Sequence, residues 1–219
     1  MAGDPFATPP SPVTGCLSPE GVAEASALAK TLADIRIDVA LVSPYGRAVE
    51  TAERALAGRG VRMARVAGLE EWMPSETFRH AISTEAEAML ERDRRRHAEE
   101  TWKTELGEGV FDMLARVVPA FLDALAAEGW RMRSGGWVPD DGAEGKTVAL
   151  FAHGGSLNAV LSFLLGVRPF PVGVFSFAHC GVATVDFTER AGVYFPALRI
   201  AAGAPDPARI TQGRPPAKP

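Results

Sequence analysis

Apolar and polar positions along this chain alternate in blocks that predict helices and strands in turn. Ser18-Pro19-Glu20 has the residues typical of a helix start, and the apolar positions that follow recur at helical spacing. An apolar, β-rich run over residues 37–42 predicts a strand. Ser43-Pro44 repeats the helix start, with Ser43 as the expected cap of a helix that continues to about Ala55. A short strand is predicted over 61–66.

The second half of the chain repeats this alternation after a long helical stretch. Residues 72–130 are predicted to be a helical excursion, with a charged helix over 83–104 and an amphipathic helix over 109–127. Residues 131–145, rich in Gly and Asp, are expected to form a loop. The remaining predicted elements are a strand over 148–152, a helix to about 165, and strands over 181–188 and 193–200.

Strands that alternate with helices indicate the α/β class. We expect a three-layer α/β/α sandwich with a mostly parallel sheet, in one domain over residues 15–200, with the excursion 72–130 covering its site. Residues 1–14 are expected to be irregular, and the Pro- and Ala-rich residues 201–219 to be a disordered tail.

The charge and composition of the chain limit the kinds of partner that we expect it to bind. The 219 residues carry a net charge of −4 and no long basic stripe, which argues against nucleic acid as a partner. No signal peptide or apolar span is visible, so no membrane association is expected. Cys16 and Cys180 follow no metal or redox spacing, which favours reduced thiols and a cytoplasmic location.

Two segments carry candidate chemistry, each at the carboxyl end of a predicted parallel strand, where open α/β sheets bind ligands. Arg47 follows the first strand, and its guanidinium could bind phosphate or pair with a neighbouring acid such as Glu50 on the surface. His153 follows the second strand and precedes Gly154-Gly155, which open a helix whose amides favour anions. A core histidine bonded to backbone is the alternative for His153.

The pattern Ser-Pro-x-x-Arg-Ala-x-x-Thr-Ala over residues 43–52, with the strand-His-Gly-Gly-helix at His153, resembles the histidine phosphatase superfamily, the phosphoglycerate-mutase-like enzymes. The resemblance implies hydrolysis of a small phosphorylated substrate without metal or organic cofactor. It implies that Arg47, His153 and Gly154 bind the phosphate, and that His153 also stabilises the transferring group. Glu71 is the expected proton donor.

Two further acids compete with Glu71 for that role. Glu70 is adjacent, and Glu108 lies in a Gly-Glu-Gly segment similar to the family's Gly-Glu-Ser. Either of the adjacent acids, Glu70 or Glu71, could instead be a solvated loop charge. A rival assignment as an α/β-hydrolase fails, because Gly154 to Asn158 does not form the Gly-x-Ser-x-Gly nucleophile elbow.

The family begins with a strand that ends in Arg-His-Gly, whose His is the nucleophile, and this chain shows no such strand. Gly3-Asp4-Pro5 resembles the end of that motif, which places Met1 and Ala2 at the Arg and His positions. We therefore expect either an N-terminally truncated phosphatase or, as the alternative, a catalytically inactive module that binds phosphorylated ligands. The oligomeric state is not predicted.

Overall fold

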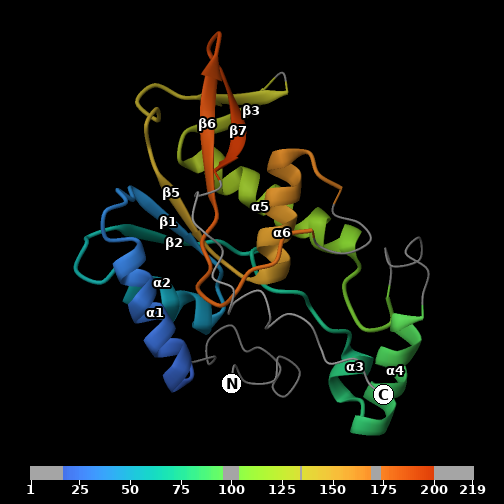
Figure 1. Ribbon diagram of the computed structural model, residues 1–219. Coiled ribbons are helices and arrows are strands. Elements are labelled where there is room, and N and C mark those ends of the chain that lie inside the picture. Colours follow the sequence, from blue (N-terminus) through green and yellow to red (C-terminus); the bar gives the residue numbers. More distant parts are fainter. Residues whose placement is uncertain (1–16, 96–103, 134, 169–173, 200–219) are drawn as a thin grey trace, which may run out of the picture.

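The computed structural model of the protein describes residues 17–95, 104–133, 135–168 and 174–199. Its centre is a parallel sheet of three strands in the order β2 (Arg62–Arg65), β1 (Val39–Val42) and β5 (Val148–Phe151) (Figure 1). The three strands predicted from sequence over 37–42, 61–66 and 148–152 are therefore present.

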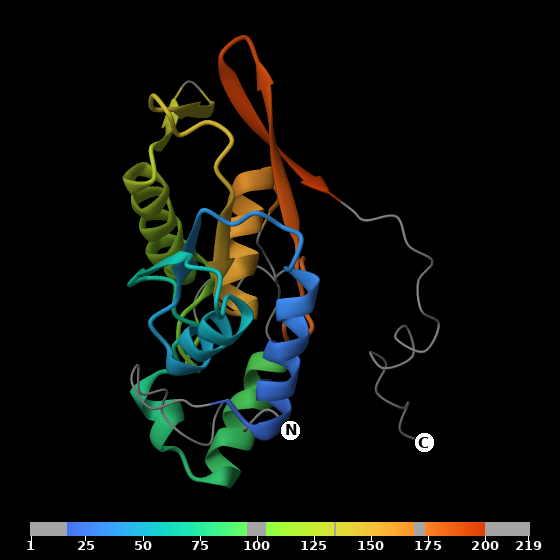
Figure 2. The ribbon, with the colours of Figure 1, turned by 90° about the vertical axis from the view of Figure 1, so that its left-hand side faces the viewer.

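Helices cover both faces of this sheet. α1 (Pro19–Thr31) and α2 (Gly46–Ala55) pack on one face, and α5 (Val110–Ala127) and α6 (Gly154–Leu165) on the other (Figures 1 and 2). Ser18 caps α1 as predicted, because its side chain accepts a hydrogen bond from the Gly21 amide at 3.2 Å. The α/β fold class is confirmed.

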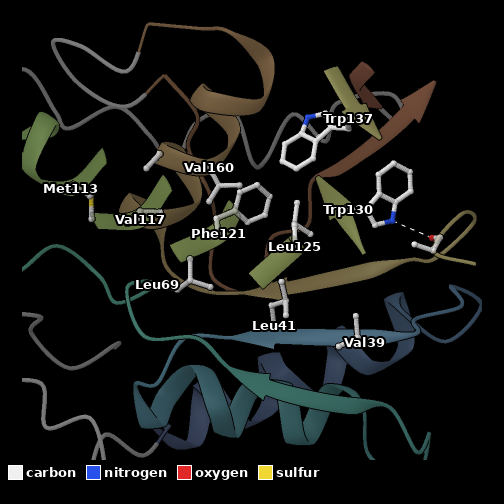
Figure 3. Packing of buried hydrophobic residues seen from close by; sticks show 12 residues of the cluster. Val39, Leu41, Leu69, Met113, Val117, Phe121, Leu125, Trp130, Trp137 and Val160 are labelled. Carbon is white, nitrogen blue, oxygen red and sulfur yellow. Dashed lines mark hydrogen bonds between the residues drawn. The ribbon is translucent and has the colours of Figure 1, made fainter. Parts of the chain in front are cut away.

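The two-residue period of β1 divides its side chains between the two layers. Val39 and Leu41 belong to the core formed with α5 and α6, whereas Ala40 and Val42 pack with α1 and α2. Each of these four residues is at most 1% exposed. Figure 3 shows Val39 and Leu41 beneath the apolar side chains of α5 and α6. β1 is thus the fully buried centre of the domain.

A second sheet, antiparallel and four-stranded, was not predicted from sequence. Its order is β3 (Trp130–Arg133), β4 (Gly136–Pro139), β7 (Val193–Arg199) and β6 (Thr184–Arg190). β6 and β7 match predicted strands, but the prediction of a loop over 131–145 is wrong at β3 and β4. The hairpin forms because Trp130 and Trp137 bury their rings against Phe121, Phe187 and Tyr194.

The helical stretch 72–130 divides into two parts. α5 is a layer of the main core, whereas α3 (Glu76–His80) and α4 (Ser83–Arg94) lie away from the sheet (Figure 1). Phe78, Met89 and Leu106 form a small core of their own there. The charged helix predicted over 83–104 ends at Arg94, and its residues 96–103 lie outside the described residues.

One edge of the parallel sheet is open within the described residues, because β5 pairs only with β1. Its apolar residues Val148, Ala149 and Leu150 are partly exposed, in contrast to the buried residues of β1. None of the helices in the described ranges combines the length and apolar character that crossing a bilayer requires.

Candidate active site

The candidate site begins where β1 and β5 end side by side. Val42 is in register with Phe151, and the Ser43 amide donates to the Phe151 carbonyl at 2.8 Å. This register brings together the residues that follow the two strands: Ser43 Oγ and His153 Nε2 are 2.8 Å apart. Both side chains are buried, at 0% and 8% exposure. The two sequence segments predicted to meet do meet.

Ser43, however, does not cap the helix that follows it. α2 begins at Gly46, after Tyr45, and no side chain caps it. The Ser43 hydroxyl instead lies against His153 and accepts a bond from the Tyr45 amide at 3.4 Å. The predicted cap is wrong because a buried imidazole requires a polar partner, and the exposed turn amides of a helix can be solvated.

Tyr45 links Arg47 to His153. The Arg47 guanidinium lies over the Tyr45 ring, 4.9 Å from its centroid, and the Tyr45 and His153 rings are 5.3 Å apart at 59°. Sequence analysis assigned no role to Tyr45. Its place between Ser43 and Arg47 in the motif was the available signal.

Arg47 has no acidic partner among the residues that the structure describes. Glu50, the alternative partner considered from sequence, pairs instead with Arg54 at 2.8 Å and accepts from the Leu17 amide. Burial lowers the pKa of Arg47, and the charge of Glu71 opposes that shift. A partly buried guanidinium without a protein carboxylate is suited to an anionic ligand.

His153 is electrically neutral in this site. Burial lowers its pKa to about 3, and the positive charges of Arg47 and Arg116 contribute to the shift. A neutral imidazole has one donor and one acceptor nitrogen. His153 can therefore exchange a hydrogen bond with a phosphate while adding no charge of its own.

Glu71 reaches the same corner from the loop before α3. Its two carboxylate oxygens accept from the Gly155 amide at 3.1 and 3.2 Å, and Oε1 also accepts from the Trp72 amide at 2.8 Å. Gly155 permits this approach, because a Cβ there would overlap Glu71 Oε1. The carboxylate thus lies at the amino end of α6, one turn from His153.

The other candidate acids are engaged elsewhere. Glu108 receives two hydrogen bonds from the Arg116 guanidinium, at 2.7 and 2.6 Å. Glu70 accepts from the Gly68 amide at 2.7 Å and from Arg116 at 3.3 Å. Of the three acids, Glu71 is the one that the structure brings to the His153 helix. Arg116 was not singled out from sequence.

Gly154 is exposed at the start of α6, and no described residue bonds to its amide.

The remaining described histidines lie elsewhere: His80 is 3.2 Å from Glu76 and His179 is 3.7 Å from Glu24. Within the described ranges, no group of three His, Cys, Asp or Glu side chains is placed to hold a metal. His97 lies outside the described residues.

The fold is of the α/β class, and its candidate site lies at the carboxyl ends of two parallel strands. A family model described as the histidine phosphatase superfamily (branch 1) matches residues 13–194. The chain belongs to this family, as its motifs predicted. Comparison with curated protein sequences gives no significant match.

Several solved structures share the fold at low sequence identity. A mycobacterial hydrolase 1 superposes with a TM-score of 0.66 at 21% identity, over 84% of this chain and 85% of its own. A mycobacterial glucosyl-3-phosphoglycerate phosphatase gives 0.64 at 20%, over 84% and 86%. The alpha-ribazole phosphatase of Shigella flexneri gives 0.62 at 18%, over 87% and 88%.

Proposed function

We propose that this protein hydrolyses small phosphate monoesters at the site formed by Arg47, His153, Gly154 and Glu71. The observation that carries the proposal is the meeting of four groups at one corner of the fold: a guanidinium and a helix amide with no acidic or backbone partner among the described residues, a neutral imidazole and a carboxylate. Membership of the histidine phosphatase superfamily supports phosphatase-type chemistry.

Each residue has a role in this reaction. Arg47 and the Gly154 amide hold the phosphoryl oxygens, and His153 donates a hydrogen bond that strengthens as charge develops there. As the bond from phosphorus to the ester oxygen breaks, Glu71 gives its proton to the leaving oxygen. When water then attacks the phosphoryl group on the nucleophile, Glu71 takes the proton back.

The structural neighbours support the substrate class. Their names describe a glucosyl-3-phosphoglycerate phosphatase, an alpha-ribazole phosphatase and a phosphoserine phosphatase, the last solved with phosphoserine. The mycobacterial phosphatase was also solved with inorganic phosphate. Two of these names contain small phosphorylated compounds, glucosyl-3-phosphoglycerate and phosphoserine, and we propose a substrate of this class here. Cys180 is a free thiol, which supports the proposed cytoplasmic location.

The nucleophile is not among the described residues. Ser43 is fully buried, and the base beside it, His153, has a pKa of about 3 that makes it a poor proton acceptor. We propose that a further strand, ending in the Arg-His-Gly that the resemblance implies, pairs with the open edge of β5. The partly exposed apolar residues of β5 support this placement, since they leave an edge suited to another strand.

The test compares the chain as given with a chain extended by such a strand. Turnover of p-nitrophenyl phosphate is measured for both, and phosphate binding by calorimetry. We expect turnover in the extended chain only, and loss of phosphate binding in Arg47→Met. Arg54→Met is the control, since Arg54 lies on the same helix and pairs with Glu50. An extended chain that folds and binds phosphate but turns over no phosphomonoester would refute the hydrolase.

That last outcome would support the second candidate, a module that binds phosphorylated ligands without turnover. The observation that favours this candidate is the unpaired Arg47 beside His153 in a site whose described residues include no suitable nucleophile. Phosphate binding that Arg47→Met leaves unchanged would refute both candidates.

A further inference from the structure

We propose that Arg116 is a positioning residue which, together with Glu108, holds the Glu71 carboxylate at the amino end of α6. This inference rests on the proposed function, in which Glu71 moves the proton. The hydrogen bonds of Arg116 and Glu108 are with each other and with the loop that carries Glu71, and none is with Arg47 or His153 among the described residues.

Arg116 projects from α5 and binds the loop through its backbone carbonyls. Its guanidinium donates to the carbonyls of Gly68 at 2.9 Å, Glu70 at 3.2 Å and Glu71 at 3.3 Å. The remaining donors form the two-pronged contact with Glu108 at 2.6 and 2.7 Å. A planar group with five donors suits such a set of fixed acceptors, whereas an ammonium does not.

Glu108 fixes the other end of the loop. Its Oε2 accepts from the Met73 amide at 3.0 Å, and its carbonyl accepts from Trp72 Nε1 at 2.8 Å. The loop is therefore held on both sides of Glu71, by Arg116 before it and by Glu108 after it. Within the described residues, these contacts hold the loop where the Glu71 carboxylate reaches the Gly155 amide of α6.

Gly68 brings the loop into direct contact with α5. Its φ of +100° is a conformation that favours glycine, and a Cβ there would overlap the Ala120 side chain. The loop backbone thus contacts α5 at Ala120, one helical turn after Arg116. The contact explains how a residue on α5 sets the position of a carboxylate at α6.

Arg116 also places a positive charge beside Glu70 and Glu108, two of the three neighbouring acids. Arg116 lies between Glu70 and Glu108, and these three side chains are 20%, 15% and 15% exposed. Their partial burial makes the guanidinium a stronger counter-charge than it is in water. Glu71 is left as the acid that accepts from the Gly155 amide.

The test reads the Gly155 amide directly, by its proton and nitrogen chemical shifts at one fixed pH. We expect Glu71→Gln to move this signal, because the amide loses its carboxylate acceptor. Arg116→Met combined with Glu108→Met should move the signal in the same direction, because the loop no longer holds the carboxylate on the amide.

The paired substitution avoids leaving Glu108 without its cation, which could unfold the protein. Arg116→Lys is the second variant, since it keeps the charge and loses the two-pronged contact, and we expect a smaller shift of the signal in the same direction. The matched control is Arg62→Met combined with Glu128→Met, which removes another arginine–carboxylate pair, bonded at 2.5 and 2.6 Å. It should leave Gly155 unchanged.

A cooperatively folded variant of either kind whose Gly155 amide keeps its wild-type chemical shifts would overturn the inference. This readout needs no turnover, so it fails or succeeds independently of the hydrolase proposal. In a catalytically active, extended chain, the paired substitution should lower kcat about 10- to 100-fold with little change in KM, as expected when a reacting group is misplaced.

Discussion

Substitution of Gly155 by alanine tests the central contact of the site. Gly155 is the second residue of α6, and its amide donates to both oxygens of Glu71. A methyl group there would overlap Glu71 Oε1 and approach Met113 Cε to 2.9 Å. Methionine can move aside, because its side chain is flexible. The carboxylate has to leave the amide, so Gly155→Ala removes the contact without touching Glu71 itself.

The magnitude follows from two opposing terms. Hydrogen bonds to a charged group contribute about 1.5–3 kcal/mol to stability. Alanine is favoured over glycine within a helix by up to about 1 kcal/mol. The difference predicts a net loss of about 1–2 kcal/mol, which lowers Tm by roughly 2–8 °C in a domain of this size.

Gly154→Ala is the matched control. It lies one residue earlier in the same turn of α6, and a methyl group there would meet only Glu71 Oε2, at 3.9 Å. That is an ordinary van der Waals distance, so the helix preference acts alone. We expect Gly154→Ala to keep or raise Tm, by up to about 4 °C. Thermal and urea unfolding of both variants measure the difference.

The double variant isolates the contact from the backbone effect. In a Glu71→Ala background the overlap is gone, so Gly155→Ala should no longer destabilise. The alanine preference cancels between the two backgrounds, so the coupling between the two positions should be the contribution of the contact itself, about 1.5–3 kcal/mol. Equal shifts in Tm for the two glycine variants, or a coupling near zero, would show that the Glu71 carboxylate does not rest on this amide.

Three further predictions concern stability. In the folded protein the pKa of His153 is about 3, whereas in the unfolded chain it is about 6.5. As the pH falls below 6.5, the unfolded chain therefore gains a proton that the folded chain does not, and the free energy of unfolding falls by about 2 kcal/mol from pH 6.5 to pH 5. His153→Gln should remove this contribution, as measured by urea unfolding at each pH. Arg47→Met should leave Tm unchanged or raise it, because burial disfavours the charged guanidinium and no described acid pairs with it; a fall of several degrees would contradict the assignment of Arg47 to a ligand. Ser18→Ala should lower Tm by about 2–4 °C through loss of the α1 cap, about 1 kcal/mol, whereas Ser26→Ala, on the exposed face of α1, is the control.

The parts of the fold that the sequence predicted are those with a strong local pattern. β1 and α1 combine an unbroken apolar run or a regular helical spacing with a recognisable start, and both form as predicted. β3 and β4 lack such a pattern, because only Trp130 in β3 and Trp137 in β4 are large apolar residues facing the core. Their partners, Phe187 and Tyr194, are distant in sequence, so tertiary packing decides the structure.

The candidate site also has parts that a local sequence pattern predicts and parts that depend on tertiary packing. Arg47 and His153 could be proposed from sequence because each follows a strand within a motif. The resemblance alone favours Glu71 over Glu70 and Glu108, because the spacing of the three acids does not decide among them. The choice depends on Arg116, which engages Glu70 and Glu108 and leaves Glu71 for Gly155. A residue on a helix 45 positions away from Glu71 in sequence leaves no local signal in the loop.

Charge at the site leads to the last prediction. His153 is neutral, and Glu71 opposes the single unpaired cation, Arg47, so the described residues offer a phosphate no net positive charge. Glu71→Gln removes the opposing charge while keeping the shape of the side chain. We expect it to bind inorganic phosphate about tenfold more tightly at neutral pH, roughly 1.4 kcal/mol, well within the ~4 kcal/mol of two charges 4 Å apart near a protein surface. Calorimetry of both chains with inorganic phosphate, in the same buffer at neutral pH, measures the two affinities. Equal affinities at neutral pH would mean that the bound phosphate lies outside the field of Glu71, and that this carboxyl is not placed to give the proton.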